Sequence, residues 1–143
     1  MATIPKLPAV SIQDLNSGVA NTALESLGIQ FTAITEDYLE ASMPVDRRTH
    51  QPHGILHGGA SVLLAESLGS TGASLMVDRK KYICVGIEIN ANHISAIRSG
   101  TVIGRAMPVH VGRSTQVWEI KIRGEDGRLI CISRLTLAVT EVR

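Results

Sequence analysis

The stretch HGGASVLLAESLGSTGASLMV, residues 57–77, is the key to the rest of the chain. It contains no proline, shows no alternation of apolar and polar residues, and is long enough for about five helical turns. We therefore predict one long helix over 57–77. Each of its four glycines disfavours a helix by roughly 0.5 to 1 kcal/mol relative to alanine. Either a tightly packed sheet or a bound substrate must require the missing side chains.

Alternating apolar residues on both sides of this helix predict strands. Before it, we expect a hairpin from 29–33 and 39–45, preceded by a short helix in NTALESLG (21–28) with Asn21 as N-cap. The segment 46–56 is a connecting loop. After the helix, we expect strands over 83–93, 101–111, 115–123 and 129–140, with GEDG as the turn between the last two. One buried face of the first of these strands is predicted to hold Ile83, Val85, Ile87, Ile89, Ala91 and His93.

One long helix and five to six strands predict an α+β fold in which a curved antiparallel sheet packs on a central helix. The 143 residues are enough for one hydrophobic core, so we expect a single domain over 1–143. Such a sheet has open edges, and pairing with a second copy would cover them. A homo-oligomer is therefore expected.

Composition argues against several classes of function. The net charge of +1 supplies no field that would attract nucleic acid or a membrane surface. The N-terminus lacks a signal peptide pattern, and no apolar run is long enough to span a membrane. Cys84 and Cys131 lie in apolar strands without a CxxC spacing, which favours reduced thiols and a cytoplasmic location over a disulfide.

Glu66 is the only formally charged residue in 57–77. A glutamate on a helix is commonly just a partly exposed surface residue. Here, however, its neighbours one turn away are Val62, Leu63, Gly69 and Ser70, and none of them can pair with a charge. A carboxylate against such a face loses solvation, which makes it a candidate base or nucleophile. Ser70 lies about 40° around the helix and is either an orienting hydroxyl or a small packing residue.

His57 and Gly58 open the predicted helix, where backbone N–H groups lack intrahelical partners and suit a developing oxyanion. Glu66 lies nine residues beyond His57, about 13.5 Å along the axis and on the opposite side. The N–H groups at the helix start and the Glu66 carboxylate of the same helix therefore cannot both reach one atom. Helices of two subunits could, which would place the active site at an interface.

Other kinds of site have little support. The spacing of His50, His53 and His57 suggests zinc, but Pro52 and Gly54 disfavour a helix there, and no cysteine or acidic residue of that segment completes a tetrahedral set. We expect no metal. The sequence also lacks a GxSxG elbow, a Walker A loop and a dinucleotide-binding glycine pattern, which argues against the corresponding enzyme classes.

Several motifs together resemble a known family. They are MPVDRRTHQPHGILHGGASVLLAESLGS, VGIEINANHI, HVGRSTQVWEI and SRLTLAV. This combination is similar to the hotdog-fold acyl-CoA thioesterases of the phenylacetate-type group, and most similar to 1,4-dihydroxy-2-naphthoyl-CoA hydrolases of menaquinone biosynthesis. The resemblance implies a hotdog fold, a homodimer with a continuous sheet and an active site at its interface, and a tetramer of two dimers. It implies hydrolysis of an aryl acyl-CoA thioester, with coenzyme A as part of the substrate and no separate cofactor.

The resemblance also assigns roles to residues. Glu66 is the catalytic carboxylate, Gly58 the backbone donor to the thioester carbonyl, and Gln51, His57 and Ser70 are supporting polar groups. The implied coenzyme A contacts are Gly86, then His93, Ile94, Ser95 and Ala96, then His110, Val111, Gly112, Arg113, Ser114 and Thr115. Close relatives often have a basic residue and a proline where this chain has Ile94 to Ala96, so Arg113 is the expected phosphate partner.

Three alternatives to an aryl-specific hydrolase stay open at this stage. The chain could be a thioesterase of broad specificity. It could also be an acyl-thioester hydratase or dehydratase that pairs His57 with an acid. The third alternative is a non-catalytic module that binds acyl-CoA, against which Glu66 counts.

Overall fold

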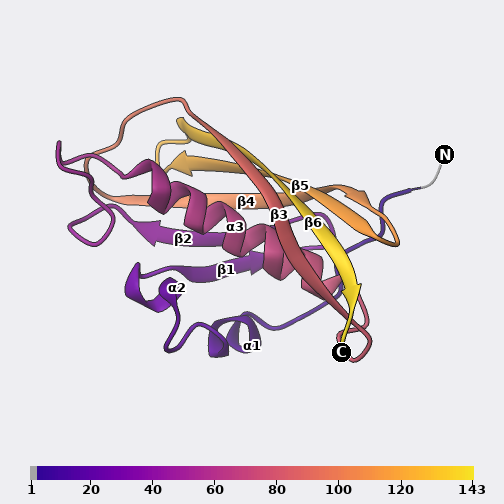
Figure 1. The fold of residues 1–143 in the computed structure, drawn as a ribbon. Helices are drawn as coiled ribbons and strands as arrows, with labels where there is room; N and C mark the ends of the chain where they lie inside the picture. Colours follow the sequence, from indigo (N-terminus) through magenta and orange to yellow (C-terminus); the bar gives the residue numbers. More distant parts are fainter. Residues whose placement is uncertain (1–2) are drawn as a thin grey trace.

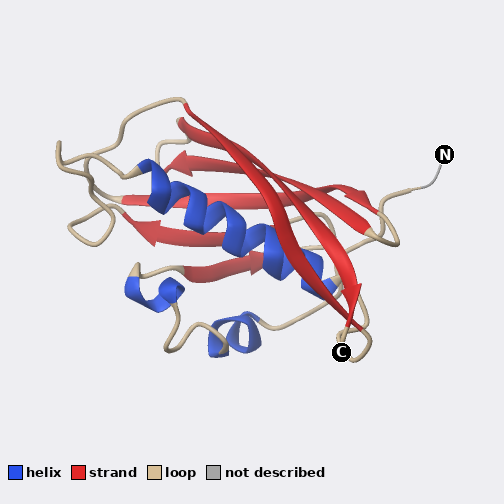
Figure 2. Ribbon diagram, viewed as in Figure 1, coloured by secondary structure: helices blue, strands red, loops and turns tan. Residues whose placement is uncertain are grey.

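The computed structural model describes residues 3–143 as an antiparallel sheet curved around one long helix. The strands lie in the order β1-β2-β4-β5-β6-β3, and Figures 1 and 2 show the sheet wrapping around α3. This is the predicted hotdog arrangement. The elements are α1 (Ile12–Ser17), α2 (Ala23–Ser26), β1 (Gln30–Ile34), β2 (Leu39–Pro44), α3 (Gly58–Leu75), β3 (Tyr82–His93), β4 (Thr101–Val111), β5 (Thr115–Gly124) and β6 (Leu129–Glu141).

The predicted helix over 57–77 is confirmed, although it begins one residue later and ends two residues earlier than predicted. His57 is the N-cap in an extended conformation, and Met76 is the C-cap. The predicted strands at 101–111, 115–123 and 129–140 agree with β4, β5 and β6 to within one residue. Long helical and alternating patterns therefore located these elements well.

Two glycines of α3 allow the helix to lie unusually close to the sheet. A Cβ atom at Gly69 would be 2.6 Å from Leu135 Cδ2, and one at Gly72 would be 2.6 Å from Trp118 Cη2. Leu135 and Trp118 are fully buried beneath them. Of the two reasons expected for the glycines, tight packing against the sheet therefore explains this pair.

The N-terminal helices differ from the prediction. The predicted short helix is the single turn α2, and its N-cap is Thr22, whose hydroxyl accepts from the Leu24 N–H. Asn21 instead adopts a left-handed conformation with φ of 61°. Helix α1 was not predicted, although Ser11 caps it by accepting from the Asp14 N–H, in an S-x-x-D pattern typical of helix starts. None of the helices within residues 3–143 is long and apolar enough to cross a membrane.

The predicted face of β3 is wrong at one end of the strand. A β-bulge between Gly86 and Glu88 shifts the register against β6. Before the bulge, Cys84 and Gly86 face α3, while Ile83, Val85 and Ile87 are exposed. After it, Ile89 and Ala91 pack against the core as expected. The extra residue of a bulge reverses which side chains face inward, and the unbroken alternation of the sequence hides it.

The two edge strands of the sheet, β1 and β3, differ in whether a side chain bonds to their free backbone groups. Asn16 of α1 donates its amide N–H to the Phe31 carbonyl at 2.9 Å and accepts from the Phe31 N–H at 2.8 Å, so it caps the free edge of β1. Among residues 3–143, β3 pairs only with β6, and its other edge carries no such cap. The β3 edge is thus the one open to another strand.

Replacing Gly72 by alanine tests the close helix–sheet contact. The new methyl group would press on Trp118, which is buried on all sides, so Gly72→Ala should destabilise the protein by about 1 to 3 kcal/mol despite the better helix propensity of alanine. Urea unfolding followed by circular dichroism measures this. Gly18→Ala is the matched control, because its nearest contact would be 3.7 Å away. Equal stability of both variants would contradict the packing constraint.

Candidate functional site

A cavity at the start of α3 brings together many of the residues expected at the site. It has a volume of about 320 Å³. Gln51, Gly58 and the whole segment from His93 to Ala96 line it, although they come from a loop, a helix and a strand end. Sequence analysis missed its other lining residues, which are Ile55, Leu56, Ser61 and Ile130.

The first N–H of α3 is available for a ligand in this cavity. Gly58 is the first residue of the helix, and its N–H has no acceptor within residues 3–143. The His93 ring lies against Gly58, because a Cβ atom at Gly58 would be 2.9 Å from His93 Nε2. Glycine here leaves the room that the imidazole occupies. The positive end of the helix dipole adds to the attraction of the Gly58 N–H for an oxyanion.

Two further side chains have their donor groups fixed by hydrogen bonds. His57 Nδ1 accepts from the Gly59 N–H at 2.7 Å, so in the neutral ring the proton is on Nε2. Gln51 Oε1 accepts from the His53 N–H, which leaves the Gln51 NH₂ group as a donor. Gly58 and Gln51 therefore offer donors to the cavity, which suit an oxygen atom that gains negative charge, whereas His57 is exposed and is not among the described residues that line it.

A short ionic turn holds the loop that carries Gln51. Arg48 donates to both oxygens of Asp46, and this pairing lowers the pKa of Asp46 to about 2. The Asp46 carbonyl accepts from the His50 N–H, and the buried Thr49 hydroxyl donates to the Pro44 carbonyl. Asp46 therefore stays ionised at any ordinary assay pH, and this turn connects β2 firmly to the site.

Glu66 lies farther along α3, against the bulged part of β3. A Cβ atom at Gly86 would be 2.8 Å from Glu66 Oε1, so the carboxylate occupies space that only glycine leaves free. Glu66 is partly exposed in the single chain. The expected loss of solvation would therefore need a further surface to cover it. Gly86, expected among the coenzyme A contacts, is placed instead beside the carboxylate.

The site residues thus fall into two groups within one chain. Gly58 and Glu66 are eight residues apart, or about 12 Å along the helix axis. The turn from His110 to Thr115 lies near the Glu66 group, because the Ser114 carbonyl accepts from the Val139 N–H and Val139 pairs with Cys84. His93 is at the opposite end of β3. The structure therefore does not bring the two sets of expected coenzyme A contacts together in a single chain.

Ser70 does not contact Glu66 through a hydrogen bond within residues 3–143. Its side chain is partly buried and lines a separate groove between α3 and the N-terminal helices. Of the two roles considered for Ser70, orienting the carboxylate has no hydrogen bond to support it here. Of the α3 residues that line this groove, Ser70 is the one nearest to Glu66 along the helix.

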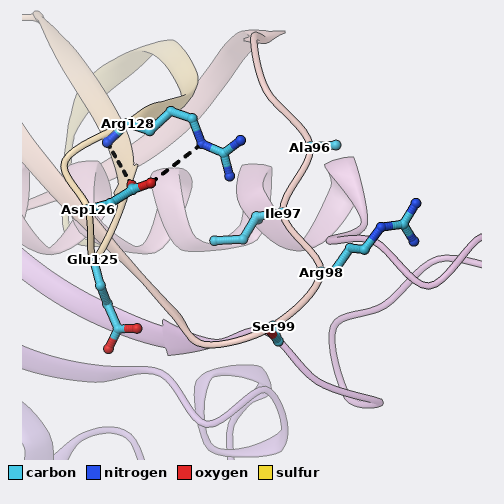
Figure 3. Close-up of a pocket in the computed structure, with 7 residues that line it drawn as sticks. All are labelled: Ala96, Ile97, Arg98, Ser99, Glu125, Asp126 and Arg128. Atoms are coloured by element: carbon cyan, nitrogen blue, oxygen red, sulfur yellow. Dashed lines mark hydrogen bonds and ion pairs between the residues drawn. The ribbon is translucent and has the colours of Figure 1, made fainter.

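A second cavity adjoins the first at Ala96. It lies between Ala96–Ser99 and the tip of the β5–β6 hairpin and has a volume of about 540 Å³. Figure 3 shows Ile97 pointing into it and Asp126 pairing with Arg128, whereas Arg98 turns away. Arg98 and Arg128 are balanced by Glu125 and Asp126 among the lining residues. Without a net positive charge, this cavity has no electrostatic preference for a phosphate.

Comparison with known proteins agrees with this geometry. Residues 53–131 match the thioesterase superfamily, and this range includes Gly58, Glu66 and Gly86. The chain belongs to the thioesterase superfamily. A crystal structure of a mutant thioesterase from Pseudomonas aeruginosa is 49% identical, superposes with a TM-score of 0.94, and covers 97% of this chain and 100% of its own.

Relatives that are named for a thioesterase or hydrolase activity span nearly the same length. The chain is 48% identical to 1,4-dihydroxy-2-naphthoyl-CoA hydrolase of Escherichia coli, over 91% of this chain and 95% of that protein. It is 49% identical to a proofreading thioesterase of Cronobacter turicensis, over 91% and 94%. The chain is therefore an enzyme that hydrolyses thioesters, and the predicted family and fold are confirmed.

Replacing Gly86 by alanine tests the placement of Glu66. The added methyl group would displace the carboxylate, and a shift of about 1 Å in a reacting group costs on the order of a hundredfold in rate. We expect Gly86→Ala to lower kcat for release of coenzyme A thiol by that factor while the thermal unfolding midpoint changes little. Unchanged kcat would show that the position of Glu66 against Gly86 does not matter.

Proposed function

We propose that this thioesterase hydrolyses aryl acyl-CoA thioesters to the carboxylic acid and free coenzyme A. The observation that carries the proposal is the Gly58 N–H, which has no acceptor within residues 3–143 and opens into a cavity next to Gln51 and His93. Such a donor would bind the thioester carbonyl oxygen as it becomes negatively charged. One oxyanion donor of this kind lowers the barrier by roughly 3 kcal/mol.

Glu66 is proposed to act as the general base or the nucleophile of the reaction. As a general base it takes a proton from water, which attacks the carbonyl carbon; as a nucleophile it attacks the carbon itself and forms a mixed anhydride that water then cleaves. In both routes, one water adds across the carbon–sulfur bond and coenzyme A leaves as the thiol. The partly exposed carboxylate is accessible to water for either route.

A homodimer is proposed to complete the site. The separation of about 12 Å between Gly58 and Glu66 prevents both from acting on one carbonyl within a chain. If β3 pairs antiparallel with β3 of a second copy, the Gly86 end of one strand approaches the His93 end of the other. Glu66 of one subunit would then face the Gly58 donor of its partner, and that partner surface would supply the missing desolvation.

The edges of the sheet support pairing through β3 rather than β1. Asn16 caps the β1 edge with two hydrogen bonds, while no described residue caps the β3 edge. Three large apolar side chains are also exposed on β3, among them Ile87 at 65%. A tetramer of two dimers would further cover the exposed Ile103 and Met107 on β4.

The proposed physiological substrate is 1,4-dihydroxy-2-naphthoyl-CoA, because the E. coli relative of that name matches nearly the whole chain. The second candidate is a thioesterase of broader specificity. It is favoured by the similarly close match to a proofreading thioesterase, which has a different name and role. For the coenzyme A phosphates, Arg113 stays the proposed partner, since the cavity beside Ala96 has balanced charges.

A substrate panel with Glu66→Gln tests the activity and its range. Thiol release should be measured from 1,4-dihydroxy-2-naphthoyl-CoA, benzoyl-CoA, phenylacetyl-CoA and hexanoyl-CoA. We expect the naphthoyl thioester to be preferred and Glu66→Gln to lower kcat by about 10² to 10⁴. Burial raises the pKa of both Cys84 and Cys131, so the enzyme's own thiols should add little to the signal. Full activity of the variant would rule out the role of Glu66.

Mixing two inactive variants tests the shared site. Gly58→Pro removes the N–H donor at a helix position that accepts proline, and the extended His57 before it is compatible with this change. The added ring atoms also press on His93, so both effects inactivate the site that contains this substitution. If each site uses Glu66 from one subunit and Gly58 from the other, refolding Gly58→Pro together with Glu66→Gln gives heterodimers with one intact site. About a quarter of wild-type activity should return. If both groups act within one chain, mixing restores nothing.

A further inference from the structure

Ser61 differs from the other buried polar residues of the chain. Four polar side chains are buried within residues 3–143, and they are Thr49, Ser61, Gln116 and Ser133. Three of them donate to backbone carbonyl oxygens; the Ser133 hydroxyl, for example, donates to the Asn90 carbonyl at 2.8 Å. Ser61 is only 1% exposed, yet its hydroxyl has no hydrogen-bond partner in this described part of the chain. A buried polar group without a partner destabilises a fold, so its presence points to a ligand.

The Ser61 hydroxyl opens into the cavity at the start of α3. Within residues 3–143, every side-chain nitrogen or oxygen that is fully sealed from solvent has a hydrogen-bond partner. The Ser61 oxygen has no partner and is therefore not sealed. The open space beside it is the cavity of about 320 Å³ that Ser61 lines together with Gly58 and Gln51. The hydroxyl is thus available to a molecule bound in this cavity.

The same hydroxyl lies within one helical turn of the Gly58 N–H. Ser61 follows Gly58 by three residues, which is about 4.5 Å along the axis and about 60° around it. Side chains of an α-helix tilt toward its N-terminus, so the Ser61 side chain leans back toward Gly58. Both groups line one cavity, and both belong to the same subunit.

The backbone of α3 leaves a single free donor at this end. The Gly59 N–H donates to His57 Nδ1, and the N–H groups of Ala60 and Ser61 donate to the His57 carbonyl. Of the first four N–H groups of the helix, only that of Gly58 lacks an acceptor among residues 3–143. Oxyanions in acyl transfer are typically held by more than one donor, so side chains must supply the others.

We propose that the Ser61 hydroxyl is a further catalytic group, which donates to the thioester oxygen together with the Gly58 N–H as negative charge develops there. This rests on the proposed thioester hydrolysis and adds a residue to the same site. Gln51 also offers a donor, but it comes from a loop and is only partly buried, whereas Ser61 is buried on a rigid helix. Water competes little for a donor in such a place, which strengthens its bond to a charged oxygen.

Replacing Ser61 by alanine should affect activity and stability differently. Loss of the donor should lower kcat for thiol release about 100-fold, measured with the thioester that the wild type hydrolyses best. KM should change little, because the oxygen gains its charge only in the transition state. The thermal unfolding midpoint should not fall, since alanine is the better helix former and the protein loses no internal hydrogen bond.

Ser133→Ala is the matched control for Ser61→Ala. It also removes a buried hydroxyl, but one that has a protein partner and lies outside the cavity. This control should lower the unfolding midpoint and leave kcat unchanged. Wild-type kcat in Ser61→Ala would overturn the proposal. A fall of its midpoint as large as that of Ser133→Ala would also overturn it, because the hydroxyl would then have a structural role.

The carbonyl stretch of a bound ketone separates this proposal from the proposed function. In the ketone analogue of benzoyl-CoA, a CH₂ group replaces the thioester sulfur, so the compound is not hydrolysed. A hydrogen bond to a carbonyl lowers its infrared stretching frequency. The bound ketone should therefore absorb at a higher frequency in Ser61→Ala than in the wild type, and at the wild-type frequency in Ser133→Ala.

If the wild type hydrolyses no thioester, the proposed function fails, and the infrared comparison alone decides the role of Ser61. A frequency that rises only in Ser61→Ala would still support a hydrogen bond from this hydroxyl to a bound carbonyl. Equal frequencies in Ser61→Ala and the wild type, or a ketone that does not bind the wild type, would overturn the proposal.

Discussion

The close approach of α3 to the sheet is the constraint on which the rest of the molecule depends. Gly69 and Gly72 give up helix stability so that Leu135 and Trp118 can fill the space beneath the helix. Trp118 in turn donates to the Gln116 side chain, and Gln116 donates to the Ala73 carbonyl at 3.3 Å. The helix is thereby fixed in rotation as well as in height, which determines the direction of every residue on its outer face.

This fixed rotation explains how one helix can serve several parts of a site. Its start presents the Gly58 N–H to a cavity shared with His93, and its third turn presents Glu66 to Gly86. Beyond them, Thr71 and Ser74 face the N-terminal helices. The donor, the carboxylate and the groove are therefore spaced along one rigid element, and precise spacing is what a reaction between bound groups requires.

How much the sequence predicts depends on the range of the interactions involved. The helix over 57–77 and strands β4 to β6 follow from periodicity, which is a local property. The bulge at Gly86 could not be predicted, because Ile83, Val85 and Ile87 continue the alternation of Ile89 without a break. The residues of the cavity at Gly58 were largely identified by resemblance. The contact between Glu66 and Gly86 was not, since it depends on the bulged register.

The bulge in β3 affects both the surroundings of Glu66 and the exposed surface of this edge strand. It turns Gly86 toward Glu66 and, by the same shift, turns Ile83, Val85 and Ile87 toward solvent. Nothing in the described part of the chain caps this edge strand, and three large apolar side chains exposed on it would favour aggregation of a monomer. The same sequence protects its other edge with Asn16, so the difference is specific to β3. One local irregularity thus makes room for the carboxylate and prepares the surface that a second subunit would cover.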